Sequence, residues 1–322
     1  MGTKLKKVFH EIKSLKIQGA TMVASKIAVT LKDYGERIKT NNLRIWQNKL
    51  RQSADYLLSV RPTEPMAQNG VKFIFQELNG LSRYARSREA GQKIKNVEEA
   101  KNCLWKAVNN FLILIENAAR KILSQTQKIK IIENKENIFT HCHSYLVEQF
   151  LLQAKKTGKR FQVFNTETRP LFQGHITARN LLKAKIPVTM VADSASAFLI
   201  SHYSGKNLMM DKVFLGADAV LKNGGVINKI GSFGISLAAH NERIPLYIIT
   251  TLLKFHPKTW IKIERRSVKE IWQKAPKELE MINFAFDFIP AQYIKGIICE
   301  AGIIKPQEVE KVVKKIYPWL MG

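Results

Sequence analysis

The sequence predicts an α/β protein in which an N-terminal helical domain is followed by a Rossmann-like domain built on a parallel sheet. As far as about residue 130, apolar residues recur at steps of three and four, which is the period of a helix with one buried face. From residue 131 onward, short runs of branched and aromatic residues alternate with helical patterns, as in strand–helix–strand units. We therefore expect one domain over residues 1–130 and a second over 131–322.

The first domain is expected to contain four amphipathic helices. They cover about residues 5–15, 21–34, 43–61 and 97–125. Pro62 predicts the end of the third helix, because the residue before a proline avoids helical geometry. Asn96 and Glu99 have the spacing of a capping box, which predicts the start of the fourth helix.

Six strands are expected in the second domain. They cover residues 138–140, 161–164, 188–191, 213–215, 246–249 and 294–298, and helical patterns at 144–156 and 177–183 separate the first three. The sequence has no Gly-x-Gly-x-x-Gly after a strand and no Walker motif. These absences argue against a nicotinamide dinucleotide and against a P-loop nucleotide site.

The chain is strongly basic, with 52 Lys and Arg against 26 Asp and Glu and a formal net charge of +26. This charge fits a nucleic-acid or polyphosphate partner, but it also fits a solvated basic surface, which the scattered lysines favour. Three cysteines make no disulfide framework and indicate a reducing compartment. Because neither a signal peptide nor a run of about 18 apolar residues is present, we expect a cytoplasmic protein without a membrane partner.

Cys142 lies in the segment Thr-His-Cys-His-Ser at 140–144, where the first expected strand ends and a helix begins. A helix N-terminus favours the thiolate form, which can act as a base or a nucleophile. A buried structural cysteine is the alternative interpretation. The two flanking histidines do not predict zinc, because adjacent residues on a strand point to opposite faces and no second Cys/His cluster follows.

Asp218 has the equivalent position after the strand at 213–215, in a stretch that continues through Asn228 and Lys229 to Gly231. We expect Asn228 and Lys229 on tight turns and Gly231 at the start of a helix. A carboxyl group recessed beside a thiolate could hold a proton, so the two groups would make a base and acid pair for moving protons between adjacent carbons. A turn or helix-capping aspartate is the alternative.

Other polar residues follow other strands, and therefore point to the same edge of the sheet. Arg169 could hold a phosphate bidentately or make an ordinary surface ion pair, Gln173 could place an amide near a ligand, and Lys254 could add a cation. Asp193 and Asp287 also lie past strands or in turns, but each could be a cap and neither is given a catalytic role. The convergence predicts a site more strongly than any single residue does.

Five segments together resemble one superfamily. They are Thr-His-Cys-His-Ser at 140–144, Thr-Glu-Thr-Arg-Pro at 166–170, Gly-Ala-Asp at 216–218, Asn-Lys-Ile-Gly at 228–231 and Lys-Phe-His-Pro at 254–257. The superfamily unites ribose-1,5-bisphosphate isomerase, methylthioribose-1-phosphate isomerase and the regulatory subunits of translation initiation factor two-B. The chain looks most like the archaeal-type bisphosphate isomerases.

The resemblance implies an aldose–ketose isomerase that converts ribose 1,5-bisphosphate to ribulose 1,5-bisphosphate without a metal or an organic cofactor. It implies that Cys142 and Asp218 transfer the protons, and that the second domain forms a homo-oligomer, either a dimer or a hexamer. The residues expected to bind the phosphorylated sugar are Gln18, Gly19, Ala20, Arg61, His143, Ser144, Arg169, Gln173, Asn228, Lys229 and Lys254.

Two alternatives within the superfamily remain. Gln18 stands where the family has a phosphate-binding arginine, which loses a charge-assisted hydrogen bond and favours a non-catalytic regulatory subunit. Such a subunit would bind a sugar phosphate or nucleotide as a sensor, and its basic surface would bind RNA or a translation factor. The other alternative is methylthioribose-1-phosphate isomerase. Retained Cys142 and Asp218 favour an enzyme, and the segment that begins at Lys254 matches the bisphosphate isomerases.

Overall fold

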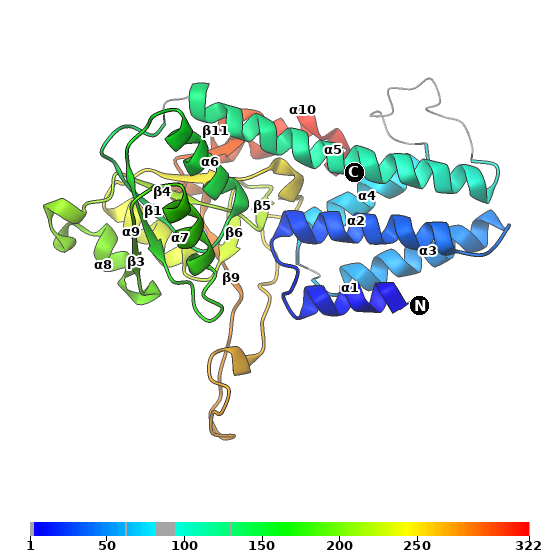
Figure 1. Ribbon diagram of the computed structural model, residues 1–322, viewed down its shortest axis with the longest axis horizontal. Helices are drawn as coiled ribbons and strands as arrows, with labels where there is room; N and C mark the ends of the chain where they lie inside the picture. The colour runs from blue at the N-terminus through cyan, green and yellow to red at the C-terminus, as the bar shows by residue number, and fades with distance from the viewer. Residues whose placement is uncertain (1–2, 62, 81–93, 129–130, 322) are drawn as a thin grey trace. The chain divides into compact units, whose positions relative to one another are not determined.

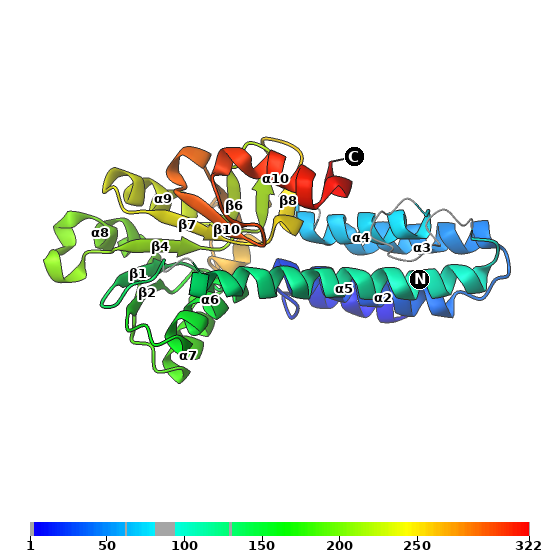
Figure 2. The same cartoon turned by 90° about the horizontal axis from the view of Figure 1, so that it is seen from above.

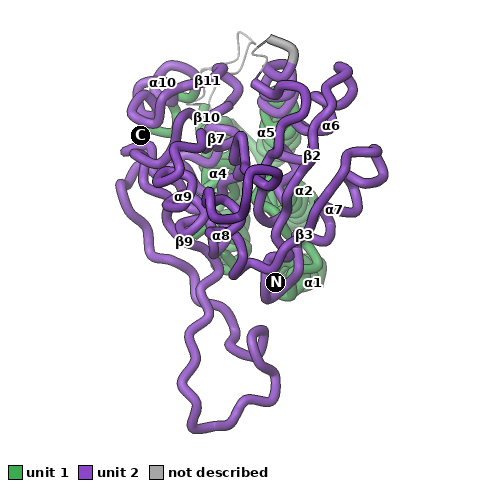
Figure 3. The backbone as a smooth tube through the Cα atoms, turned by 90° about the vertical axis from the view of Figure 1, so that its left-hand side faces the viewer, with its two compact units in different colours: residues 1–117, 317–322 green, residues 118–316 purple. Residues whose placement is uncertain are grey.

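A computed structural model describes residues 3–61, 63–80, 94–128 and 131–321. The chain forms two compact units, which Figure 3 shows in different colours. Unit 1 comprises residues 1–117 and 317–322, and unit 2 comprises residues 118–316. Within the described ranges, no helix is long and apolar enough to cross a membrane.

Unit 1 is helical (Figure 1). Its helices are α1 (Thr3–Lys13), α2 (Ala20–Arg37), α3 (Leu43–Leu58), α4 (Pro65–Leu78) and the first part of α5 (Val97–Lys128). The four predicted helices are present, whereas α4 was not predicted. The third helix ends at Leu58, three residues before the predicted end, and Pro62 lies outside the described residues.

Two contacts show how this unit is held together. The indole N–H of Trp46 donates a 2.9 Å hydrogen bond to the carbonyl of Gly35, and a Cβ on Gly35 would lie only 2.4 Å from Leu104. Glycine therefore allows α2 to approach α3 and α5 closely. At the start of α5, Asn96 Oδ1 accepts the N–H of Glu99 at 2.9 Å, while Glu99 Oε2 accepts the N–H of Lys95 at 2.8 Å. The predicted cap is confirmed, with the return bond one residue earlier than in a standard capping box.

The main sheet of unit 2 has seven strands in the order β11-β10-β7-β4-β1-β2-β3. Six are parallel to their neighbours: β1 (Asn137–Thr140), β2 (Gln162–Thr166), β3 (Val188–Val191), β4 (Lys212–Leu215), β7 (Leu246–Ile249) and β10 (Gly296–Cys299). All six were predicted. The edge strand β11 (Gly302–Ile304) is antiparallel and was not.

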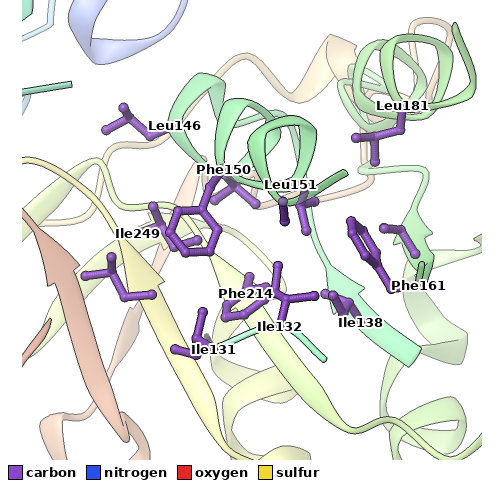
Figure 4. Close-up of a cluster of buried hydrophobic side chains, with 14 of the residues drawn as sticks. Ile131, Ile132, Ile138, Leu146, Phe150, Leu151, Phe161, Leu181, Phe214 and Ile249 are labelled. Atoms are coloured by element: carbon purple, nitrogen blue, oxygen red, sulfur yellow. The ribbon is translucent and has the colours of Figure 1, made fainter. Parts of the chain in front are cut away.

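Helices cover both faces of this sheet (Figure 2). On one face, α6 (Tyr145–Lys156), α7 (Gly174–Lys183) and the end of α5 enclose an apolar cluster that includes Phe150, Leu151, Phe214 and Ile249 (Figure 4). On the other face lies α9 (Ser232–Asn241), beside the short α8 (Ser196–Ile200). The last helix of the unit is α10 (Val309–Ile316). The predicted parallel α/β domain is confirmed.

A second sheet, which the sequence did not predict, has the order β8-β5-β6-β9. Its strands are β8 (Phe255–His256), β5 (Ala219–Leu221), β6 (Val226–Lys229) and β9 (Phe286–Ile289). The expectation that Asn228 and Lys229 lie on tight turns is therefore wrong, because they end strand β6, where they pair with Asp287 and Phe286. Asn and Lys are poor strand formers, so pairing with distant segments decides their conformation.

The segment between β8 and β9 extends away from the rest of unit 2 (Figures 1 and 3). A single antiparallel bridge joins Arg265 to Phe284. Arg266 makes a hydrogen-bonded ion pair with Glu270, at 2.6 Å between Nη2 and Oε1. Trp272 is 52% exposed and Ile282 is 53% exposed. The segment therefore has polar internal contacts and presents large apolar side chains outward.

Candidate active site

Strands β1 and β4 are neighbours at the centre of the main sheet, and the strand order reverses between them. From β1 the chain proceeds through β2 to β3 on one side, and it then returns to β4 on the other side. Ligands of open α/β sheets bind outside the carboxyl ends of the strands at such a reversal. Cys142 follows β1 and Asp218 follows β4, and the Asp218 carboxylate lies close enough to act on the pKa of the Cys142 thiol. The structure thus brings these two predicted residues together.

Cys142 occupies a tight, buried turn. Its φ is +68°, its side chain is among the buried residues, and its backbone N–H donates a 3.0 Å hydrogen bond to Thr168 Oγ1. Its thiol donates to Gln173 Oε1 at 3.5 Å, so the predicted amide lies beside the sulfur. Two residues later, Ser144 caps α6 by accepting the N–H of Val147 at 3.5 Å.

Burial raises the pKa of the Cys142 thiol to about 11. The Lys229 ammonium and a backbone hydrogen bond from His143 lower this pKa, whereas the Asp218 and Asp193 carboxylates raise it. The expectation that the helix N-terminus holds a thiolate here is wrong. Helix α6 begins at Tyr145, Ser144 already caps it, and the thiol lies in a buried turn before that cap. The resting thiol is therefore protonated at neutral pH.

Asp218 is half-buried, and its backbone N–H donates a 2.8 Å hydrogen bond to the carbonyl of Ile227. Two residues earlier, a Cβ on Gly216 would lie only 2.7 Å from Ser144 Oγ. Because Gly216 has no side chain, the backbone directly after β4 can lie close to Ser144, the N-cap of α6. This close approach places the Asp218 turn beside the Cys142 turn.

Two lysines and an amide lie on the Asp218 side of the site. Lys254 is 8% exposed, and its ammonium donates a 2.6 Å hydrogen bond to the carbonyl of Ala217. Lys229 Nζ is 5.1 Å from the centre of the Phe286 ring, a cation–π contact. Asn228 is buried, and its side-chain amide donates to Ser232 Oγ at 2.9 Å. Positive charge and an amide therefore flank the carboxylate.

His143 and Arg169 lie further out. The Nδ1 of His143 is 3.1 Å from Thr177 Oγ1 and 3.5 Å from Glu148 Oε2, and burial lowers the pKa of this histidine against the opposing effect of Glu148. Arg169 is exposed, and its guanidinium lies 5.1 Å from the centre of the Phe172 ring.

The remaining predicted ligands belong to unit 1. Gly19, with a φ of +83°, immediately precedes α2, which begins at Ala20, and Gln18 comes just before them. Arg61 follows α3, and its Nε is 3.6 Å from Glu64 Oε2.

The two aspartates that were given no catalytic role accept backbone N–H groups, and only Asp287 does so at the start of a helix. Asp193 accepts the N–H groups of Thr168 at 2.8 Å and Arg169 at 2.6 Å. Asp287 Oδ2 accepts the N–H groups of Gly231 at 2.7 Å and Phe233 at 3.0 Å, at the start of α9. Burial raises the pKa of Asp287 to about 6 against the opposing effect of these hydrogen bonds. Each carboxylate thus braces a segment that carries predicted site residues.

Three buried polar residues next to the site were not predicted: His141, Thr166 and Thr168. His141 Nδ1 is 2.6 Å from Thr166 Oγ1, and its Nε2 is 2.8 Å from the carbonyl oxygen of Ile230. The available signal was a run of polar residues directly after apolar strands, at 140–144 and 166–168. In the described part of the chain, no group of three or more His, Cys, Asp or Glu side chains could hold a metal ion.

Comparison with known proteins identifies the family of the chain. The profile of the initiation factor 2 subunit family matches residues 16–306. The chain belongs to this family. It is 34% identical to the ribose 1,5-bisphosphate isomerase of Methanocaldococcus jannaschii, across 98% of this chain and 96% of that protein. The resemblance to this superfamily is thereby confirmed.

Solved structures of the family share the fold. The Pyrococcus horikoshii OT3 translation initiation factor eIF-2B superposes with a TM-score of 0.78 at 24% identity, covering 95% of this chain and 98% of that one. The 5-methylthioribose 1-phosphate isomerase of the same organism gives a TM-score of 0.73 at 22% identity, covering 98% and 88%. At these identities the structures establish the fold alone.

Proposed function

We propose that the chain is an aldose–ketose isomerase that converts ribose 1,5-bisphosphate to ribulose 1,5-bisphosphate. The observation that carries the proposal is the placement of Cys142 and Asp218 after adjacent strands at the reversal of strand order, where the Asp218 carboxylate acts on the pKa of the Cys142 thiol. The full-length similarity to a relative named for this reaction supports it.

The protonated resting thiol defines the first step. Transfer of the Cys142 proton to the Asp218 carboxylate creates a thiolate base and a carboxylic acid at the same time, and the Lys229 ammonium favours the thiolate. The thiolate then takes the proton from C2 of the opened sugar and the acid delivers its proton to C1, while the proton lost from the O2 hydroxyl balances the proton that the ring oxygen O4 gained on opening. In the net reaction C2 is oxidised to a ketone while C1 is reduced, so no external oxidant or reductant is needed.

The cations and amides supply the binding of phosphate and sugar oxygens. Lys229 and Lys254 flank Asp218 on one side of the site, and Asn228 adds an amide there. For unit 1, taken by itself, the resemblance to the family implies phosphate binding at the N-terminus of α2 after Gly19 and at Arg61.

The direct test is incubation of the purified protein with ribose 1,5-bisphosphate, followed by NMR detection of the ketose. Methylthioribose 1-phosphate is assayed in parallel, because the family includes isomerases of both substrates. Turnover of the bisphosphate alone supports the proposal, and turnover of methylthioribose 1-phosphate alone reassigns the substrate. Turnover of neither substrate contradicts the proposal.

We also propose that the chain assembles as a homo-oligomer, a dimer or a hexamer. The extended segment between β8 and β9 supports this, because Trp272 and Ile282 are exposed on it and large apolar side chains of this kind mark interaction surfaces. Light scattering coupled to size-exclusion chromatography measures the mass in solution. A monomeric mass over the micromolar range would contradict the proposal.

A further inference from the structure

We propose that His141 and Thr166 are positioning residues, which lock the Cys142 turn to the end of strand β6 through a hydrogen-bond chain of fixed direction. Neither side chain is assigned a contact with substrate. The kinetic part of this inference rests on the proposed function, but the structural part concerns the Cys142 thiol itself.

The direction of the chain starts from His141, which is 2% exposed. The carbonyl oxygen of Ile230 can only accept, so the Nε2 at 2.8 Å must carry a proton and donate it. Burial lowers the pKa of His141 to about 4, so the ring is neutral at pH 7 and its Nδ1 has no proton. The Nδ1 is then an acceptor, and Thr166, at 2.6 Å, must donate its hydroxyl proton to it.

The same order of donors and acceptors continues through Thr166 and Thr168 to the backbone N–H of Cys142. Because Thr166 has a single hydroxyl proton and gives it to His141, the 3.2 Å contact between the hydroxyl oxygens of Thr166 and Thr168 requires Thr168 to donate. Thr168 Oγ1 then accepts the backbone N–H of Cys142 at 3.0 Å. Four hydrogen bonds therefore run head to tail from the Cys142 N–H to the Ile230 carbonyl, and bonds in such a chain strengthen one another.

The hydrogen-bond chain joins two residues of unusual backbone conformation to the end of β6. Cys142 and Thr168 have φ values of +68° and +66°, and such a conformation in residues other than glycine persists only when the surroundings impose it. At the far end, Ile230 follows Lys229, and a Cβ on Gly231 would lie 3.2 Å from the His141 ring. Glycine at 231 thus permits the imidazole to sit directly against the end of β6.

The consequence is a fixed placement of the Cys142 sulfur relative to Lys229, the residue whose charge favours the thiolate. Chemical steps are sensitive to such placement, since small displacements of a catalytic group lower the rate strongly. We therefore expect loss of one hydroxyl in the chain to alter Cys142 even though that hydroxyl touches neither the sulfur nor the sugar.

The experiment compares Thr166→Val, which removes the hydroxyl at nearly constant volume, with Thr166→Ser, which keeps it. Thr30→Val is the matched control, because Thr30 is also buried and its hydroxyl donates to the Lys26 carbonyl within α2. All variants are made in a Cys103→Ser background, since Cys103 is the partly exposed thiol and Cys299 is buried. The readouts are the melting temperature, the rate of Cys142 alkylation by iodoacetamide as a function of pH, and kcat and KM for ribose 1,5-bisphosphate.

We expect Thr166→Val to raise the Cys142 alkylation rate at pH 8 by about threefold or more, because a loosened turn exposes the thiol and lowers its pKa. We expect kcat to fall by on the order of 100-fold with little change in KM. Thr166→Ser should restore both readouts, and Thr30→Val should leave both unchanged.

Thr166→Val could lower the melting temperature and leave both the alkylation profile and kcat unchanged. The Thr166 hydroxyl would then contribute to stability alone, and this result would overturn the inference. Should Thr166→Val not fold, Thr168→Val cuts the same chain one bond nearer to Cys142 and is scored by the same readouts. If the parent protein turns over no sugar phosphate, the proposed function fails, whereas the alkylation profile still decides whether the chain positions Cys142.

Discussion

The ammonium of the buried Lys254 donates a 2.6 Å hydrogen bond to the carbonyl of Ala217, the residue that precedes Asp218. This bond holds a cation against the backbone of the proposed acid. A lysine ammonium has three N–H groups, and the resemblance to the family implies that this one also contacts the sugar phosphate. The side chain therefore has both a local bracing role and a proposed role in binding substrate.

Replacement of Lys254 by Met should lower kcat/KM for ribose 1,5-bisphosphate by about 10- to 100-fold, because a charge-assisted hydrogen bond is worth about 1.5–3 kcal/mol. Steady-state kinetics measure this loss. Lys222→Met is the matched control, since the Lys222 side chain makes a half-exposed ion pair with Glu310 at 3.3 Å. Equal kcat/KM values for the two variants would contradict the proposed role of Lys254 in substrate binding.

Substitution of either proposed proton-transfer group should abolish turnover while preserving the fold. Cys142→Ser replaces the thiol by a much weaker acid, and Asp218→Asn removes the carboxyl proton acceptor. Circular dichroism and the melting temperature check the fold, and NMR detection of ribulose 1,5-bisphosphate checks the reaction. Cys103→Ser, at a partly exposed thiol in unit 1, is expected to retain activity. An active Cys142→Ser, Asp218→Asn double variant would refute both roles.

The main sheet was predictable because its strands are buried runs of branched and aromatic residues, such as Val213, Phe214 and Leu215. Their carboxyl ends meet at one edge, so the convergence of Cys142 and Asp218 could also be predicted. The small sheet was not predictable, because its strands span two to four residues and two of its pairings, β5 with β8 and β6 with β9, join segments far apart in the sequence.

The electrostatics of the site required the structure. Position after a strand suggested a thiolate at Cys142, but burial by distant segments sets the pKa, and sequence spacing carries no information about burial of this kind. His141 illustrates the same limit. Its role depends on Thr166, Thr168 and Ile230, which come from different elements and meet only in the folded chain.

Gln18 offers a test of phosphate binding by unit 1. Gln18→Arg introduces the arginine that the resemblance to the family implies for this position. If the N-terminus of α2 binds a substrate phosphate, the new charge should lower KM by about 10-fold or more, since a charged donor adds about 1.5–3 kcal/mol over a neutral amide. Gln153→Arg, on the surface of α6, is the control for added charge alone. Equal KM values for the two variants would exclude Gln18 from the phosphate contact.

Asp287 gives a prediction about stability against pH. Its pKa is raised to about 6 in the folded protein, above the ordinary value of 3.8, so the folded state binds the proton more tightly than the unfolded state does. Stability contributed by this group is therefore fully present below about pH 4 and is lost as the pH rises through 6, by on the order of 2 kcal/mol. Asp287→Asn can still accept the N–H groups of Gly231 and Phe233 but does not titrate.

The difference in unfolding free energy between wild type and Asp287→Asn, measured in urea, should consequently depend on pH. Between pH 4 and pH 7 it should shift by on the order of 2 kcal/mol in favour of the variant, because only wild type must ionise a buried carboxyl group as the pH rises. Taking the difference at each pH cancels the titration of all other groups, including His141, whose lowered pKa of about 4 acts in the opposite direction. A difference that stays constant across this range would show that Asp287 is ionised in the fold well below pH 6 and that its two backbone hydrogen bonds outweigh its burial.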